Sequence, residues 1–202
     1  MTVEHAPAPV AGSRSHRLAS VIIALACIVV AGIAVHITDG ISGDVVRTVD
    51  VKQPARLDGA IITATGVRVG TRVDLGNDQS YTSKGMILAV TFRVEAPGQK
   101  YTIGGLDGVT LHTDDHSYSV FGPNTSITAD AGFASTGDML FEVDPRHIAG
   151  AYLEVYQKEI IFVVPQKLHI RLGITDQNAD QWAAAAKGRT ITTGAAESEP
   201  LP

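Results

Sequence analysis

The sequence predicts an all-β sandwich preceded by one transmembrane helix. Three observations support this fold class. Residues 18–37 form an uncharged apolar stretch, later segments alternate apolar and polar residues with the period of a strand, and turn-forming residues separate those segments. Helical periodicity is confined to one short stretch near the C-terminus.

The first element is the apolar stretch Leu18–Ile37, in which Ser20 and His36 are the clearly polar residues. At about 1.5 Å of rise per residue, a helix of this length is about 30 Å long, which matches the hydrocarbon core of a bilayer. We therefore expect a signal-anchor helix over residues 18–37. Residues 1–17, rich in small residues and proline, are expected to be a disordered stub.

The charges beside this stretch predict its orientation. Arg14, His16 and Arg17 precede it, whereas Asp39 and Asp44 follow it. Because short basic flanks favour the cytoplasmic side, we expect a single-pass protein of the cell membrane with its N-terminus inside and residues 38–202 outside.

Two other fates of this segment stay open. A cleaved signal peptide would have a shorter apolar region, and its weak cleavage site here, Gly32-Ile33-Ala34, lies deep within the stretch. A lipoprotein would use Cys27, but Ala24 stands where a leucine is usual and the chain stays apolar after the cysteine. Because Cys27 is the one cysteine of the chain, we expect no disulfide in the outer domain.

Small side chains recur along this predicted helix at steps of three and four residues, which places them on one face. Such a face lets membrane helices approach closely, so it is a candidate contact with another helix or with a second copy of the chain. The residues are Ser20, Ala24, Cys27, Ala31 and Ala34.

The part beyond residue 37 is mildly acidic. Without Glu4, Arg14 and Arg17 it keeps 14 basic and 20 acidic residues, a formal charge of −6. Nucleic acid and anionic lipid both require a concentrated basic patch, so neither is the expected main partner. We expect a linker over residues 38–44, a sandwich over 45–175, a short helix over 176–189 and a disordered tail over 190–202.

Alternation is clearest over Met86–Glu95, where Met86, Leu88, Val90, Phe92 and Val94 share one face. Residues 139–143 and 168–174 alternate in the same way. Further strands are expected over Val45–Lys52, Ile61–Val73, Val109–His112, Ser117–Phe121, Ala151–Tyr156 and Ile160–Val164. Gly66 and Gly70 indicate a bulge in the second of these, and Pro165 indicates an edge or a bulge.

Asp180 is expected to cap a short helix over Ala179–Lys187 that ends at Gly188 and docks through Trp182. The tail from about Thr190 is small, polar and acidic, which is typical of a disordered segment.

Several of these segments carry loose motifs: Thr65-Gly66-Val67, Gly85–Phe92, Asp114–Tyr118 and Gly137–Pro145. On them, residues 55–175 resemble the telokin-like, immunoglobulin-like domains of unknown function found in bacterial membrane-anchored proteins and lipoproteins. The composition, rich in Ala, Val, Gly and Thr, is similar to that of actinobacterial envelope proteins. The resemblance implies an immunoglobulin-like sandwich outside the cytoplasm and implies no reaction.

The densest group of possible metal ligands is His112, Asp114, Asp115 and His116. Zinc would require three or four of these side chains to converge. In a hairpin, however, the two histidines flank the turn and the aspartates occupy its corners, where they bond the local backbone. The sequence therefore makes these residues weak metal candidates, and we expect no cofactor.

Other chemistry has less support. Asp176–Asp180 begins like a calcium loop, but Gln181 and Lys187 stand where such a loop needs glycine and glutamate. There is no G-x-S-x-G motif, and the cysteine lies in the apolar stretch. An undetected hydrolase would need a cleft that gathers a base and a nucleophile from distant strands.

We therefore expect a non-enzymatic, membrane-anchored module that binds a protein partner or another envelope component, or that acts as an accessory subunit. The alternative is binding of a small ligand or metal ion by the sandwich loops. The five tyrosines are either an exposed contact surface or structural residues that seal sheet edges; they are Tyr81, Tyr101, Tyr118, Tyr152 and Tyr156.

Overall fold

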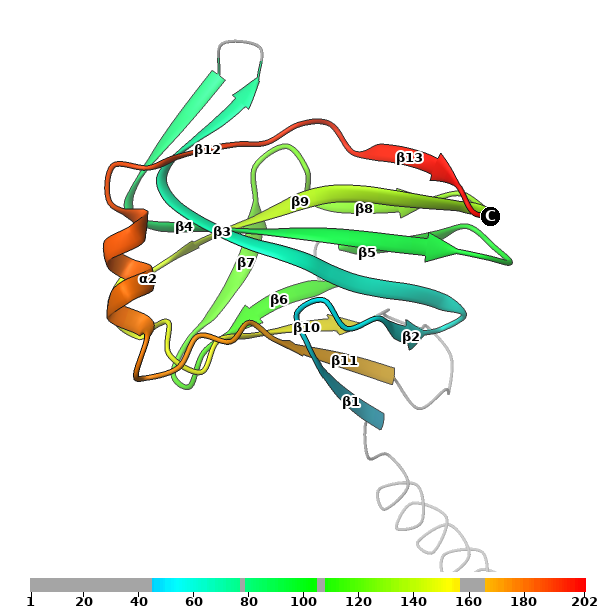
Figure 1. The fold of residues 1–202 in the computed structure, drawn as a ribbon, viewed down its shortest axis with the longest axis horizontal. Helices are drawn as coiled ribbons and strands as arrows, with labels where there is room; N and C mark the ends of the chain where they lie inside the picture. Colours follow the sequence, from blue (N-terminus) through cyan, green and yellow to red (C-terminus); the bar gives the residue numbers. More distant parts are fainter. Residues whose placement is uncertain (1–44, 77–78, 105–107, 157–165) are drawn as a thin grey trace, which may run out of the picture. The chain divides into compact units, whose positions relative to one another are not determined.

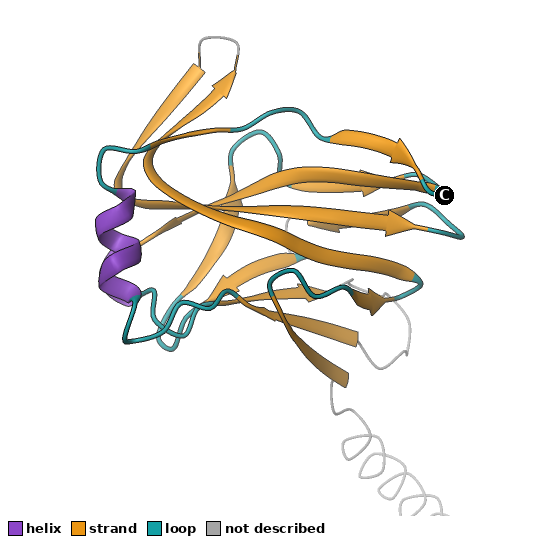
Figure 2. Cartoon of the chain, in the orientation of Figure 1, coloured by secondary structure: helices purple, strands orange, loops and turns teal. Residues whose placement is uncertain are grey.

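The computed structural model describes residues 45–76, 79–104, 108–156 and 166–202, and within them it is mostly β (Figures 1 and 2). These residues form one sheet of eleven strands and a second sheet of two. The expectation of an all-β sandwich is confirmed. The predicted signal-anchor helix lies outside the described residues, and no helix inside them has the length and apolarity that a bilayer span requires.

The elements follow one another along the chain with short connections. The strands are β1 (Val45–Asp50), β2 (Ala55–Leu57), β3 (Ala60–Gly76), β4 (Gln79–Ala96), β5 (Tyr101–Gly104), β6 (Val109–His112), β7 (Ser117–Phe121), β8 (Ser126–Ala129), β9 (Phe133–Val143), β10 (Tyr152–Tyr156), β11 (Gln166–Arg171), β12 (Thr190–Thr192) and β13 (Glu197–Pro200). A 3₁₀ turn, η1 (Pro145–His147), follows β9, and the helix α2 (Ala179–Ala186) follows β11.

Two layers enclose the core. Strands β1, β11, β10 and β6 make one layer, and β9, β4 and β3 make the other. The layers are joined through β7, which pairs with β6 and also with β9. β1 runs parallel to β11, whereas β10 is antiparallel to both of its neighbours.

The alternation of β4 explains how it serves both of its faces. Its inward residues Met86, Leu88 and Phe92 are at most 1% exposed in the main core. On the opposite face, Ile87 and Ala89 are also buried, in a second apolar cluster with Val73, Leu140 and Ile191. The strand is therefore covered on both sides over part of its length, as a central strand is.

The predicted bulges in the long second strand are confirmed. The register of β3 against β4 shifts between Ala64 and Gly66 and again between Gly70 and Arg72. A Cβ atom at Gly70 would lie 2.6 Å from the carbonyl oxygen of Arg189. Glycine is needed there because the segment after α2 passes directly over the strand.

The predicted short helix is confirmed as α2, and Trp182 packs against the main core as expected. The helix begins one residue earlier than the proposed Asp180 cap, so Asp180 lies in its first turn. Asn178 precedes the helix, and its side chain accepts a hydrogen bond from the backbone of Thr175 and donates one to Gly173. Those bonds fix the loop before the helix rather than the free N–H groups of its first turn.

The prediction of a disordered tail over residues 190–202 is wrong. β12 pairs parallel to β3, and β13 pairs antiparallel to β9 over residues 133–136. A polar composition predicts little burial, but the free edges of β3 and β9 offer backbone hydrogen bonds to almost any sequence. Ile191, 3% exposed, adds burial to this pairing. We call residues 189–201 the C-terminal strap.

Several expectations concern residues outside the described ranges and stay predictions. These are the stub, the small-residue face of the membrane helix, the linker, the strand over 160–164 and the irregularity at Pro165.

Candidate functional site

The structure separates the four weak metal candidates of the β6–β7 hairpin. Residues 113–116 form the turn, closed by a 2.9 Å hydrogen bond from the amide of Thr113 to the carbonyl of His116. Asp114 lies against Gly150, and the ring of His116 lies 4.6 Å from that of His147. His112 belongs instead to the outer face of its sheet. Within the ranges that the structure describes, no group of three His, Cys, Asp or Glu side chains is placed to hold a metal ion.

His112 lies in a cluster drawn from three neighbouring strands. The register pairs His112 with Tyr152, Glu154 with His169, and Tyr156 with Lys167. Because side chains alternate along a strand, Leu153, Val155, Leu168 and Ile170 fill the core while the paired residues face outward. We call this surface the tyrosine–histidine face: His112, Tyr152, Glu154, Tyr156, Lys167 and His169.

Aromatic stacking organises this face. The ring of Tyr152 lies between two imidazoles, 5.2 Å from the ring of His112 and 4.8 Å from that of His169. The His112 ring is nearly parallel to the tyrosine, at 18°, and the His169 ring is tilted by 40°. These spacings are within the range of favourable aromatic contacts, so the three rings hold one another in place.

Glu154 lies at the centre of the face, where its side chain is only 17% exposed. Its carboxylate is 3.1 Å from Nε2 of His169, 3.7 Å from Nζ of Lys167 and 3.9 Å from Nε2 of His112. A largely buried carboxylate is stable only with such partners. Glu154 therefore fixes the orientation of side chains from two strands beside its own.

One polar atom of the face is left unsatisfied. Nδ1 of His112 is 2.9 Å from the hydroxyl of Ser117, but its Nε2 is buried and has no hydrogen-bond partner among the described residues. The distance of 3.9 Å to Glu154 exceeds a hydrogen bond. A buried imidazole nitrogen without a partner costs free energy, which a small shift or a bound group would recover.

Ser117, His112 and Glu154 have the residue types of a hydrolytic triad. In a working triad the acid bonds the histidine and so orients it toward the serine. Here the acid and the histidine are too far apart for that bond, and the group lies on the outer surface of a sheet. The arrangement does not support nucleophilic catalysis.

The five tyrosines divide between the two roles that the sequence left open. Tyr101 is 3% exposed, and Tyr118 packs against the core. Tyr81 is exposed, and its hydroxyl donates a 2.8 Å hydrogen bond to Glu142, which raises the pKa of the phenol. Tyr152 and Tyr156 are half-buried on the outer face of β10. The sequence did not predict that these two would meet His112 and His169, because the pairing of β6, β10 and β11 is long-range.

Comparisons with known proteins give little further guidance. No family model matches the chain, and no curated protein matches it. Two solved structures are similar to it. A candidate lipoprotein of Bacillus subtilis has a TM-score of 0.46 and 18% identity over 65% of this chain. An uncharacterised β-sandwich protein of Clostridium difficile has a TM-score of 0.40 and 9% identity over 63% of it.

The matched parts cover 41% of the Bacillus protein and 95% of the Clostridium protein. The chain thus spans about two fifths of the first of these proteins. At such identities and TM-scores, neither likeness assigns a function to this chain.

Proposed function

We propose that this chain is a membrane-anchored, non-enzymatic binding module of the cell envelope that holds a protein partner on its tyrosine–histidine face. The anchor is the apolar stretch 18–37, and the immunoglobulin-like sandwich displays the face outside the cytoplasm. The observation that carries the proposal is the stacked, partly exposed arrangement of Tyr152 between His112 and His169 around Glu154.

Two physical properties make this face suitable for binding. Tyrosine and histidine offer an apolar ring and a polar tip on the same side chain, and tyrosine is enriched at the centres of protein interfaces. The side chains are also held before a partner arrives, by stacking and by Glu154, so their ordering does not have to be offset on binding.

The chemistry of the face indicates the kind of partner surface. The carboxylate of Glu154 is already surrounded by Lys167, His169 and His112. What remains for a partner is the exposed part of the rings together with hydrogen-bond donors. We therefore propose a partner that contributes apolar side chains and hydrogen-bond acceptors.

The proposal is tested by site-specific photo-crosslinking of the full-length chain in membranes. A crosslinking residue at Ser119, exposed and paired with Thr110 beside the face, should give one dominant protein adduct. The same group at Thr102, exposed on β5 in the separate small sheet, is the matched control and should not give that adduct.

The second arm combines the Ser119 crosslinker with Tyr152→Ser, which removes the central ring without charging the face. The adduct should fall at least tenfold while the melting temperature of the chain changes little. An equal adduct from Ser119 and Thr102, or one unaffected by Tyr152→Ser, would contradict the proposed face.

A further inference from the structure

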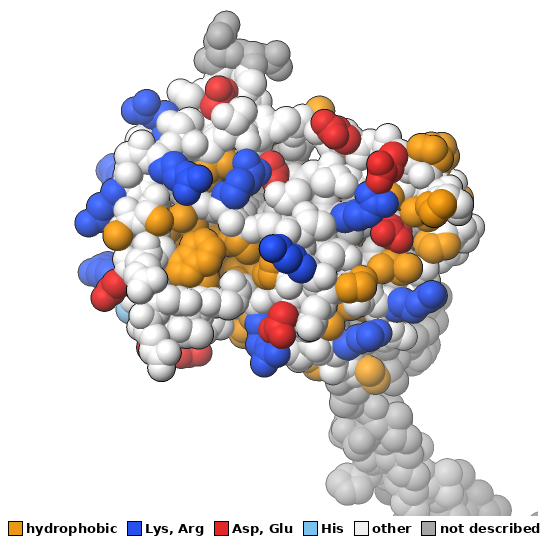
Figure 3. Space-filling model, in the orientation of Figure 1, with side chains coloured by type: hydrophobic (Ala, Val, Ile, Leu, Met, Phe, Trp, Pro, Cys, Tyr) orange, Lys and Arg blue, Asp and Glu red, His pale blue; other side chains and the backbone are white. Residues whose placement is uncertain are grey.

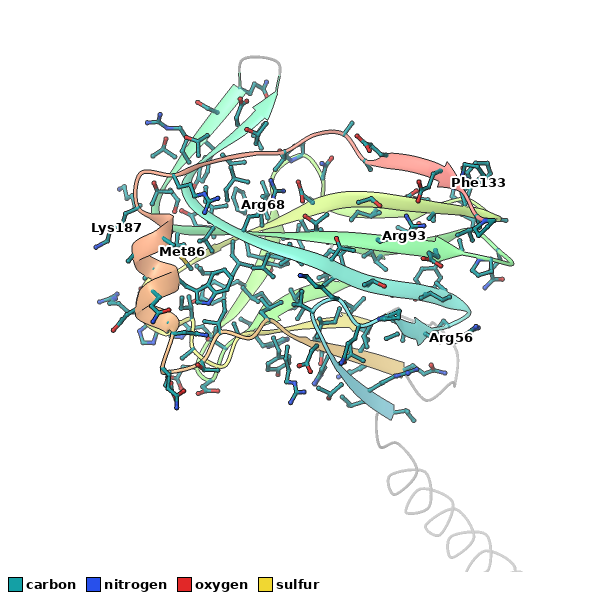
Figure 4. All side chains as sticks on the ribbon, in the orientation of Figure 1. Arg56, Arg68, Met86, Arg93, Phe133 and Lys187 are labelled. Carbon is teal, nitrogen blue, oxygen red and sulfur yellow. The ribbon has the colours of Figure 1, made fainter. Side chains whose placement is uncertain are left out.

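A second surface lies where α2 meets the hairpin of β3 and β4. A groove of about 370 Å³ runs between the helix and the strand, and its lining includes Lys84, Met86, Arg146, Asp180, Ala183 and Lys187. Figure 4 labels Met86 and Lys187 on its two sides, with Arg56 near the other end of the domain. None of the residues of the tyrosine–histidine face lines this groove.

The groove has an apolar floor because small side chains meet a buried strand there. Met86 is 1% exposed, and Ala186 of α2 is equally buried. A Cβ atom at Gly85 would lie 2.6 Å from the carbonyl oxygen of Val143, so β4 lies directly against β9 beneath the groove. Ala183 completes the helix side with a single methyl group. Larger side chains at these positions would fill the space.

The rim of the groove is basic. Lys84 and Lys187 are exposed, and neither has an acidic partner in the described part of the chain. Arg72 is also exposed, and it pairs with Thr82, two positions before Lys84, so its side chain shares the face of Lys84. Figure 3 shows Lys and Arg side chains gathered at this end of the molecule, on the left.

Two further charged side chains line the groove. Arg146 forms a two-pronged ion pair with Asp144, which lowers the pKa of that carboxyl, so its charge is already matched. Asp180 is the acidic residue of the lining. Lys84, Lys187 and Arg72 therefore outnumber it, although the part of the chain beyond residue 37 is acidic overall. Local charge of one sign over an apolar floor selects a ligand of the opposite sign with apolar groups of its own.

We propose that this groove binds an acidic, extended peptide segment of a partner protein. Its carboxylates would contact Lys84, Lys187 and Arg72, and an apolar side chain would rest on Met86 and Ala183. The groove lies at the α2 end of the domain, whereas β1, which follows the predicted anchor in the chain, begins at the other end (Figure 1). That placement favours a peptide over the headgroups of the anchoring bilayer.

Fluorescence anisotropy on the full-length chain in non-ionic detergent tests the proposal. The probe is a short labelled peptide that alternates glutamate with leucine, and the comparison peptides replace glutamate by glutamine or by lysine. We expect saturable binding of the acidic peptide alone, weakening as salt is raised. The double variant K84E/K187E should weaken that binding at least tenfold.

The matched control is R47E/R56E, which makes the same change in net charge on β1 and β2 at exposed positions away from the groove. It should bind the acidic peptide as the unmodified chain does. A third variant, Ala183→Trp, fills the groove without changing the charge and should also weaken binding tenfold or more.

Three results would overturn the proposal: equal loss in K84E/K187E and R47E/R56E, tight binding of the glutamine peptide, or unchanged binding in Ala183→Trp. Binding to phosphatidylglycerol vesicles with no binding of the acidic peptide would also overturn it and would assign the rim to lipid. None of these results depends on the Ser119 crosslink, so the two proposals fail separately.

Discussion

At the scale of single residues, the most consequential polar contact of the domain lies under the C-terminal strap. The carboxylate of Asp138 accepts hydrogen bonds from Arg68, at 2.5 Å, and from the hydroxyl of Thr91, at 2.6 Å. The other terminal nitrogen of Arg68 donates to the carbonyl of Thr192 in β12. One carboxylate thus links β9, β4 and β3, and through Arg68 it also holds the strap.

Replacing this carboxylate should destabilise the domain. Asp138→Ala leaves the guanidinium of Arg68 and the hydroxyl of Thr91 without their partner, and we expect a loss of about 2 kcal/mol in the free energy of unfolding. The matched control is Asp130→Ala, because Asp130 pairs with Lys100 and both side chains are about 70% exposed. That exposed pair should contribute less than about 1 kcal/mol. Urea unfolding measures both, and similar losses in the two variants would contradict this account.

Residue types alone misplaced the site. The sequence directed attention to His112 and His116 because they flank two aspartates, yet the hairpin sends the four side chains to different surroundings. The residues that His112 does meet, Tyr152 and Glu154, come from β10. Their proximity depends on the register of strands distant in sequence, which the local pattern of either segment does not encode.

At the scale of elements, the sequence predicted the strands whose alternation is long or whose turns are well marked. β6 and β7 begin and end where expected, and β4 shows the predicted alternation. The sequence missed β2, β5, β8, β12 and β13, which have three or four residues each. Strands this short show no period of their own, and they exist because a neighbouring edge supplies hydrogen bonds.

The C-terminal strap is the element whose removal should matter most. Deleting residues 189–202 exposes the apolar cluster of Val73, Ile87, Ala89 and Leu140 and removes the buried side chain of Ile191. We expect a loss of about 2 kcal/mol or more, since full burial of one isoleucine contributes about that amount. The unpaired edge of β9 should also promote aggregation.

A shorter deletion is the control for this experiment. Removing residues 197–202 takes away β13, whose side chains are all exposed, and keeps Ile191 over the cluster. Its loss in a chemical denaturation curve should be clearly smaller. If the two deletions were equally harmful, edge pairing rather than apolar cover would be the main contribution of the strap.

At the scale of the whole molecule, the two proposed surfaces are built on different layers. The tyrosine–histidine face belongs to β6, β10 and β11, and the groove belongs to α2, β4 and η1. A module with two separate surfaces could hold two segments of one partner at once, which increases the effective concentration of the second contact. Such a role requires the sandwich to be held where the partner is, and the apolar stretch 18–37 would do this.

The predicted topology has a direct test in cysteine labelling, because Cys27 is the one cysteine of the chain. In a Cys27→Ala background, Gln177→Cys places a thiol in an exposed turn before α2. A membrane-impermeant maleimide should label it on intact spheroplasts, since basic residues before the apolar stretch favour export of the residues after that stretch. The matched variant Ser15→Cys, on the other side of the stretch, should react only after the membrane is opened with detergent. Labelling of Ser15→Cys and protection of Gln177→Cys on intact spheroplasts would reverse the topology, and with it the claim that the two surfaces face outside the cell.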